Sequence, residues 1–146
     1  MLCAGHGNVA VYDEREEINV LVVDDHELMR QMMGQVLTRD QHIKVAGTAG
    51  DGHEAIELIT RCKEKFDVLV MDFALPGLNG VEVIRALREL SIRIPVIIVS
   101  VHEQLPLVVE AVKEGAQAFL AKKNITRELI PAVYAAYSKR RRHTRK

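Results

Sequence analysis

Short, nearly continuous runs of apolar and β-branched residues recur along this chain, and they restrict its fold more than any other feature. Four such runs cover residues 18–23, 42–49, 66–71 and 94–100, and a weaker fifth covers 116–120. A strand with one face in water would alternate polar and apolar residues, and these runs largely do not. We therefore expect strands that are covered on both faces, as in a buried parallel sheet.

The segments between these runs carry apolar residues with helical spacing. Strands that alternate with helix-length connections pair in parallel and cross over right-handedly. The sequence thus predicts an α/β domain with a five-stranded parallel sheet in the order 2-1-3-4-5 and helices on both faces, of the doubly wound, flavodoxin-like type. The expected helical stripes are Leu28, Met32, Val36 and Leu37; Ala55, Ile56, Ile59 and Cys62; Val81, Val83, Ile84, Leu87 and Leu90; Val108, Val109 and Val112; and Leu129, Ile130, Val133 and Tyr137.

Residue types that favour helix starts and turns mark several boundaries. Asp51 is expected to cap the second helix, with Glu54 three residues later. Pro76-Gly77 and Asn79-Gly80 indicate a tight loop after the third strand. Thr126 is expected to cap the last helix.

The length of 146 residues suits one domain. Residues 1–17 mix small, polar and charged residues and are interpreted as a flexible leader, and the domain itself is expected over 18–138. Residues 139–146 form a basic C-terminal tail with six basic residues and no acid. The chain has 20 basic and 20 acidic residues in all, so the first 138 residues carry 20 − 6 = 14 basic residues against 20 acidic ones. An acidic body with a basic tail is therefore a better description than a neutral protein.

The basic tail has several interpretations that the sequence leaves open. A run of charge is usually a solvated face, but this one could also bind nucleic acid, anchor to an acidic partner, or lead toward an output domain. Base-specific contacts require a positioned helix or ribbon, which one short patch does not supply. With no Trp and 4% aromatic residues, the chain offers no obvious platform for stacking single-stranded bases.

Cysteine usage and hydropathy indicate the compartment. Cys3 and Cys62 provide neither a disulfide framework nor a metal-ligand spacing, which favours reducing cytosol. No apolar run approaches the roughly 20 residues that cross a bilayer. The first 17 residues also lack the charged start and apolar stretch of a secretory signal. We therefore expect a cytoplasmic protein with no membrane partner.

Three acidic residues stand at the ends of predicted strands. Asp24 and Asp25 follow the first strand and Asp72 follows the third, while Ser100 ends the fourth and Lys122 follows the fifth. Strands one and three are neighbours in the predicted order, so their carboxyl ends meet where such sheets bind ligands. Clustered carboxylates repel one another and attract a cation, and oxygen ligands suit Mg²⁺. One carboxylate could then act as a nucleophile toward phosphorus, with Lys122 and Ser100 binding the phosphoryl oxygens.

Each of these residues also has a purely structural interpretation. An Asp after a strand is a common helix cap, and Asp72 before a Pro-Gly loop could be a turn residue. A single Ser or Lys at a strand end is ordinary. The meeting of all five residues at one edge of the sheet favours the functional interpretation.

These motifs resemble the receiver domains of bacterial response regulators. The resemblance lies in residues 20–26 (VLVVDDH), 67–82 (DVLVMDFALPGLNGVE) and 115–122 (GAQAFLAK). In this order and spacing they cover about residues 18–138, and they are most similar to receivers of the NarL/LuxR-type subfamily. The resemblance implies the (βα)5 receiver fold and a switch in two-component signal transduction, which is a phosphoacceptor and not an enzyme with a diffusible substrate.

The resemblance also implies a role for each site residue. Asp72 would accept a phosphoryl group from a sensor histidine kinase or phosphotransfer protein in a Mg²⁺-dependent step. Asp25, Asp72 and the backbone carbonyl of Ala74 would hold the metal directly, and Asp24 would act mainly through water.

Three further residues would bind the phosphoryl group or transmit the change. Ser100 and Lys122 would bind the phosphoryl group, and Phe119 matches the aromatic switch position. The surface formed by the fourth helix, fifth strand and fifth helix would then change as two pre-existing states shift in population. Transcription regulation through a LuxR-type DNA-binding domain outside this chain, and a homodimer, are the outputs that the resemblance suggests.

The sequence departs from the family pattern in three respects. Val101 follows Ser100 where a smaller residue is usual, which could narrow access to Asp72. Phe119 lacks the hydroxyl group of the commoner Tyr. Subfamily members usually continue into a helix-turn-helix domain, whereas this sequence stops at Lys146, so a stand-alone receiver and a fragment are both open.

Two alternative functions use the same fold. A pseudo-receiver would be a constitutive interaction module, but the acids, Ser100 and Lys122 are all present. A phosphohydrolase with an aspartyl-phosphate intermediate would have a general acid two residues after Asp72, where this sequence has Ala74.

Overall fold

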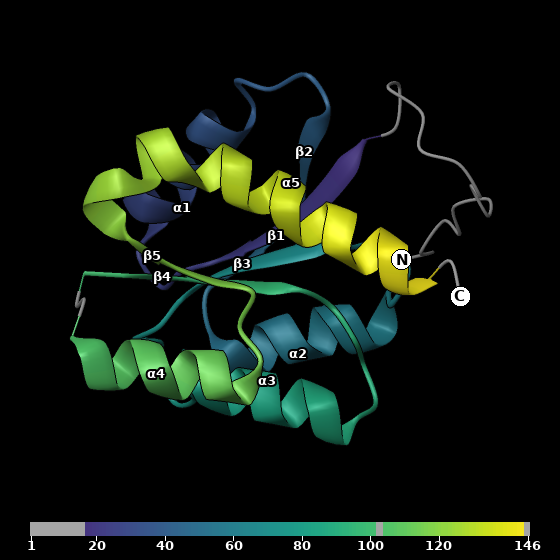
Figure 1. The fold of residues 1–146 in the computed structure, drawn as a ribbon, viewed down its shortest axis with the longest axis vertical. Helices are drawn as coiled ribbons and strands as arrows, with labels where there is room; N and C mark the ends of the chain where they lie inside the picture. Colours follow the sequence, from purple (N-terminus) through teal and green to yellow (C-terminus); the bar gives the residue numbers. More distant parts are fainter. Residues whose placement is uncertain (1–16, 102–103, 145–146) are drawn as a thin grey trace.

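A computed structural model describes residues 17–101 and 104–144, with side chains described up to residue 140. Nearly all of the expected leader, 1–17, lies outside the described residues. Within them, strands and helices alternate along the chain as the sequence predicts (Figure 1). The elements are β1 (Ile18–Val23), α1 (Glu27–Leu37), β2 (Ile43–Ala49), α2 (Gly52–Arg61), β3 (Val68–Asp72), α3 (Gly80–Glu89), β4 (Val96–Ser100), α4 (Leu105–Glu114), β5 (Ala118–Ala121), a 3-10 turn (Lys122–Asn124) and α5 (Ile125–Thr144).

The five strands form one parallel sheet in the order β2-β1-β3-β4-β5, which confirms the predicted topology. Helices α1 and α5 cover one face, and α2, α3 and α4 cover the other (Figure 1). The central strands β3 and β4 are buried at every position, which explains their continuous apolar sequences. Within the described residues, no helix has the length and apolarity that crossing a membrane would require.

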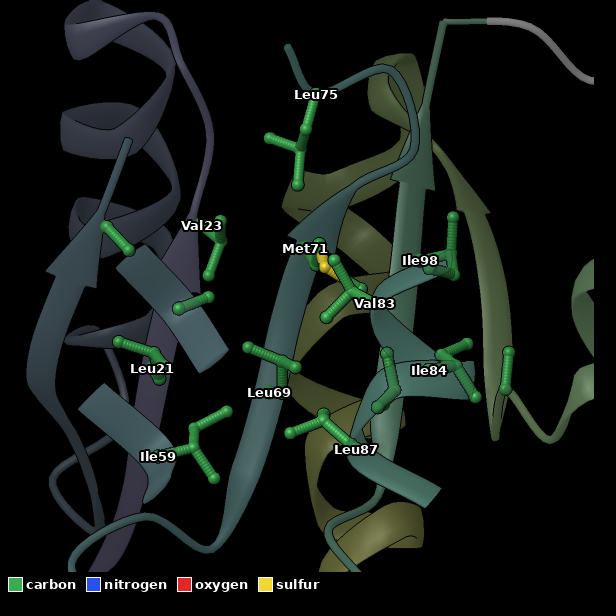
Figure 2. Packing of buried hydrophobic residues seen from close by; sticks show 14 of the residues in the cluster. Leu21, Val23, Ile59, Leu69, Met71, Leu75, Val83, Ile84, Leu87 and Ile98 are labelled. Carbon is green, nitrogen blue, oxygen red and sulfur yellow. The ribbon is translucent and has the colours of Figure 1, made fainter. Parts of the chain in front are cut away.

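The sheet separates two apolar clusters. On the α2–α4 side, Leu69 and Met71 of β3 pack with Ile59 of α2 and Leu87 of α3 (Figure 2). On the other side, Val68 and Val70 point toward α1 and α5, whose buried residues include Met33 and Leu129. Alternate residues of each central strand thus enter opposite clusters, and this fixes the strand ends that carry the polar residues.

The buried faces of two helices differ from the predicted stripes. In α1, Leu28 is 80% exposed and Met32 43%, while the neighbouring Met33 is fully buried. In α4 the predicted Val109 and Val112 are exposed, and the only buried residue is Ala111. The last residue of the third stripe, Leu90, is also exposed. In each helix the apolar pattern is broader than the face in contact with the sheet, so packing selects among several apolar residues.

Helix ends follow the predictions in part. The Asp51 carboxylate accepts the Glu54 backbone N–H at 2.8 Å and caps α2, as predicted. The prediction for Thr126 is wrong, because the 3-10 turn runs directly into α5 at Ile125. Helix α5 continues through Thr144, so most of the basic tail is helical.

Cys62 corrects another expectation. It is buried at the C-terminal end of α2 and takes part in a disulfide whose other half lies outside the described residues. A single cysteine within a helical stripe carries no sequence signal of a disulfide, so nothing indicated this bond.

Candidate functional site

The polar residues predicted to meet stand at the carboxyl ends of β1, β3, β4 and β5. Val23 pairs with Met71, which places Asp24 and Asp72 at neighbouring strand ends. Ser100 pairs with Ala121, one residue before Lys122. Parallel pairing therefore brings these side chains to a single edge, as the sequence predicts.

Lys122 connects the two most buried acids. Its Nζ atom donates to Asp24 Oδ2 at 3.2 Å and lies 3.4 Å from Asp72 Oδ1. Asp24, Asp72 and Ser100 are the buried polar side chains of the described structure, with exposed fractions of 0%, 4% and 1%. A carboxylate in such surroundings is costly unless it is paired, so one ammonium group between two carboxylates is a stabilising arrangement.

The pKa of Asp72 is raised above the ordinary value for aspartate. Burial is the largest cause, because the charged form loses solvation. The nearby negative charge of Asp24 raises the pKa further. The positive charge and hydrogen bond of Lys122 oppose both effects, as does the backbone N–H of Ala74, which donates to the carboxylate.

The β1–α1 connection brings a histidine to the acids. The His26 backbone N–H donates to Asp24 Oδ1 at 2.8 Å, in a turn that leads into α1. The His26 ring nitrogen Nδ1 lies 3.2 Å from Asp25 Oδ1 and 3.3 Å from Asp24 Oδ1. Arg30, one turn into α1, donates to the backbone carbonyl of Asp24. Sequence reasoning missed the contacts of His26 and Arg30, because they depend on how α1 is oriented against β1.

The donor set fits a hard divalent cation. One ligand atom each from Asp24, Asp25 and His26 lies within 4.8 Å of the others. Lys122 contacts the carboxylates of Asp24 and Asp72, and the carboxylate of Asp25 lies close to Asp24, so the three acids leave excess negative charge at this edge. Carboxylate oxygens are the ligands that Mg²⁺ prefers, and the imidazole adds a nitrogen donor that softer metals accept.

The loop between β3 and α3 is held close to Asp72. Gly77 has φ = +80°, a conformation that favours glycine. A Cβ atom at Gly80 would lie 2.8 Å from Ile98 Cδ1 and 3.3 Å from Phe73 Cα, so a larger residue would displace the Ile98 side chain and crowd the loop. Asn79 and Glu82 form a reciprocal capping box at the start of α3. The sequence signals Pro76-Gly77 and Asn79-Gly80 thus correspond to a constrained loop.

The residues expected to act as a switch lie beside this edge. Ser100 is buried at the end of β4, and Phe119 on β5 is half-buried against the cluster on the α2–α4 side. Val101 is 67% exposed. Its side chain therefore points largely into solvent, although the sequence suggested that it could narrow access to Asp72.

Comparison with known proteins identifies the class to which this fold and site belong. Residues 20–134 match the family described as response regulator receiver domain. The chain is 34% identical over 125 residues to the response regulator UvrY of Escherichia coli strain K12, which covers 85% of this chain and 56% of UvrY. It is also 34% identical over 118 residues to the probable transcriptional regulatory protein NarL of Mycobacterium tuberculosis, which covers 81% of this chain and 54% of NarL.

Solved structures give the same result. The signal receiver domain of NarL from Mycobacterium tuberculosis has a TM-score of 0.78 and 32% identity, and the match covers 84% of this chain and 98% of that one. A LuxR-family two-component response regulator from Aurantimonas sp. has a TM-score of 0.79 and 27% identity, with coverage of 85% and 87%.

The chain therefore belongs to the response regulator receiver domain family. Within that family it is a receiver domain of the NarL/LuxR type. It spans about half the length of the curated relatives it matches.

Proposed function

We propose that Asp72 is the phosphoacceptor of this receiver. The observation that carries the proposal is the position of Lys122 Nζ, which lies between the buried carboxylates of Asp24 and Asp72. An ammonium group there can pair with the carboxylates and then with the oxygens of an incoming phosphoryl group. Asp72 ends the central strand β3, so its carboxylate is held on a rigid element.

The transfer is a displacement at phosphorus. A carboxylate oxygen of Asp72 forms a bond to the phosphorus of a phosphohistidine on a sensor kinase or phosphotransfer protein. The N–P bond breaks, and the leaving imidazole keeps the electron pair and takes a proton from solvent. Lys122 and the Ser100 hydroxyl group donate to the phosphoryl oxygens as their charge builds up. The domain thus takes part in its own phosphorylation and is not an enzyme that turns over a separate substrate.

We assign the metal site of this reaction to the same edge. Asp24, Asp25, Asp72 and the backbone carbonyl of Ala74 would hold Mg²⁺, with Asp24 acting mainly through water. When bound, Mg²⁺ supplies positive charge that offsets the charge of the carboxylates and the phosphoryl oxygens. His26 must share Asp25 with the metal, because its ring already lies 3.2 Å from that carboxylate.

Phosphorylation then shifts the surface formed by α4, β5 and α5. Ser100 moves toward the phosphoryl group and Phe119 turns further inward, so the two states differ in the packing around α4. Support comes from α4 itself, which buries only Ala111. In the cytoplasm, this surface would control a homodimer or a LuxR-type DNA-binding domain outside this chain. DNA is then a partner of that output domain.

Incubation with acetyl phosphate and Mg²⁺, followed by intact-protein mass spectrometry, tests the assignment of Asp72. We expect the mass of one phosphoryl group to appear on the unchanged protein and to disappear in Asp72→Asn. Asp51→Asn is the matched control, because Asn caps a helix as well as Asp does. Labelling of the Asp72→Asn protein would contradict the assignment, and an unlabelled native chain would favour the pseudo-receiver.

A further inference from the structure

A basic pocket lies at the amino end of the sheet, away from the acidic site. Its volume is about 370 Å³. The residues before β4 and the C-terminal half of α5 form it: Arg93, Ile94 and Pro95 on one side, and Ala136, Lys139 and Arg140 on the other. Gln117, just before β5, completes the lining, which thus combines apolar residues with three basic side chains.

Arg140 is the fixed charge of this pocket. Its Nη1 atom donates to the backbone carbonyls of Phe66 at 2.9 Å and Asp67 at 3.0 Å, just before β3 begins. The same atom lies 3.8 Å from the Asp67 carboxylate. These contacts orient the guanidinium group before any ligand arrives, which lowers the entropic cost of binding.

The pocket has unbalanced positive charge. Arg93 and Lys139 are exposed, and no carboxylate is among the residues that line the pocket. If the Asp67 carboxylate compensates the charge of Arg140, the positive charges of Arg93 and Lys139 remain. Lining residues of this kind fit an anion, and guanidinium and ammonium groups both bind phosphate well.

The direction of α5 indicates a long anion. The helix continues beyond the pocket through Thr144, and residues 139–146 contain six basic residues and no acid. At a rise of about 1.5 Å per residue, the helical part of this run, residues 139–144, extends over roughly 9 Å. Duplex DNA carries a negative charge about every 1.7 Å along its axis, so one duplex can meet the pocket and the basic run together.

We propose that this pocket and the basic end of α5 bind the phosphate backbone of duplex DNA without sequence preference. No aromatic residue lines the pocket, so the stacking that single strands use has no platform there. The contact lies at the end of the sheet opposite Asp72 and leaves the phosphorylation site open. The receiver thereby contributes affinity for DNA of its own, separate from that of any output domain.

Fluorescence anisotropy with a labelled duplex, measured over a range of salt concentrations, tests the proposal on the full chain. The double variant Arg93→Gln/Lys139→Gln removes two exposed charges and leaves the anchored Arg140 in place. We expect its slope of log affinity against log salt to fall by about 0.9 for each lost phosphate contact, together with roughly tenfold weaker binding at low salt. The double variant Lys44→Gln/Lys63→Gln removes two exposed lysines elsewhere and should retain the native slope and affinity.

Three outcomes would overturn the proposal. The first is absence of binding by the native chain at low salt. The second is an unchanged slope in Arg93→Gln/Lys139→Gln, which would mean that neither exposed charge of the pocket contacts a phosphate. The third is displacement of the duplex by free ATP at an equal phosphate concentration, which would identify a pocket for small anions.

Discussion

Burying the carboxylate of Asp72 costs folding free energy, but the proposed chemistry requires a carboxylate at this position. Asp72 is 4% exposed, at the end of a strand that is buried at every position, where charge is poorly solvated. Lys122 offsets part of this cost but serves Asp24 as well. A carboxylate whose charge is incompletely compensated favours binding of a cation or reaction with a phosphoryl group, which suits it to phosphoryl transfer. For the same reason, we expect Asp72 to lower the stability of the folded protein when it is ionised.

Substitution of Asp72 by Asn should therefore stabilise the protein without metal at neutral pH. The folded pKa of Asp72 is raised, chiefly by burial, so the stability associated with this group is complete below the unfolded pKa. It is lost as pH rises through the folded value, and Asp72→Asn avoids that loss. We expect a gain of about 1 kcal/mol, the usual size of a single-site effect.

Urea unfolding of both proteins between about pH 4 and pH 7, in the presence of a chelator, measures this difference. The advantage of Asp72→Asn should grow with pH and vanish at the acidic end. If Asp72→Asn is less stable than the native protein at neutral pH, Asp72 has a structural role and the argument from burial is wrong.

Among the elements, α4 buries little apolar surface, and charged side chains of α3 contact its C-terminal end. It buries only Ala111, and its C-terminal residue Glu114 accepts from Arg85 Nε through both oxygens at 3.1 Å. Arg88, also on α3, donates to Glu114 Oε1 at 3.2 Å and to its backbone carbonyl at 3.3 Å. A helix held in this way can move without opening a large apolar core, as the proposed switch requires.

Glu114→Gln should loosen α4 selectively. The hydrogen bond from Arg85 is the largest cause of the lowered pKa of Glu114, so its contribution is present above the ordinary pKa of glutamate and lost as pH falls through the lowered value. Hydrogen exchange by mass spectrometry at neutral pH should show amides of α4 exchanging roughly twofold to fivefold faster.

The control for this experiment is Glu110→Gln, an exposed glutamate on the same helix that affects Arg85 by its charge alone, whereas Glu114 also accepts hydrogen bonds from it. It should leave exchange in α4 unchanged. Equal exchange in the Glu114→Gln and native proteins would mean that apolar contacts alone hold the helix.

Helix orientation is where the sequence was least informative. Met29, Met32 and Met33 are all apolar, so the pattern allows more than one buried face for α1, and contact with the sheet selects Met33. In α4, the small Ala111 permits close approach while larger valines face outward. Strand order and strand ends were predictable, because continuous apolar runs and parallel pairing leave few alternatives.

The same distinction applies to the site. Asp24, Asp72, Ser100 and Lys122 could be placed at one edge from the sequence, because parallel strands end together. The bond from Arg30 to the Asp24 carbonyl could not, because contacts between side chains and backbone depend on local geometry that no spacing encodes.

At the scale of the whole molecule, opposite ends of the sheet have opposite charge. The carboxyl end gathers Asp24 and Asp72 around Lys122, with Asp25 close to Asp24. The amino end carries the basic pocket lined by Arg93, Lys139 and Arg140. The repulsion at the acidic end is a cost to the folded state alone, because the unfolded chain separates these residues. A cation that binds only the folded protein should therefore raise the stability of the whole domain.

Mg²⁺ should stabilise the protein through Asp25 and Asp72. At a concentration about 100 times its dissociation constant, a ligand specific to the folded state adds about 2.7 kcal/mol. For a domain of this size we expect the melting temperature to rise by roughly 10 °C.

The variant Asp25→Asn tests this prediction, since the Asp25 side chain is 32% exposed and the substitution removes a charge without opening the core. Differential scanning fluorimetry with and without Mg²⁺ should show the shift in the native protein and little of it in Asp25→Asn, whereas Glu57→Gln on the exposed face of α2 should keep it. An equal shift in all three proteins would mean that the ion binds elsewhere, and the assignment of the metal to this edge would then fail.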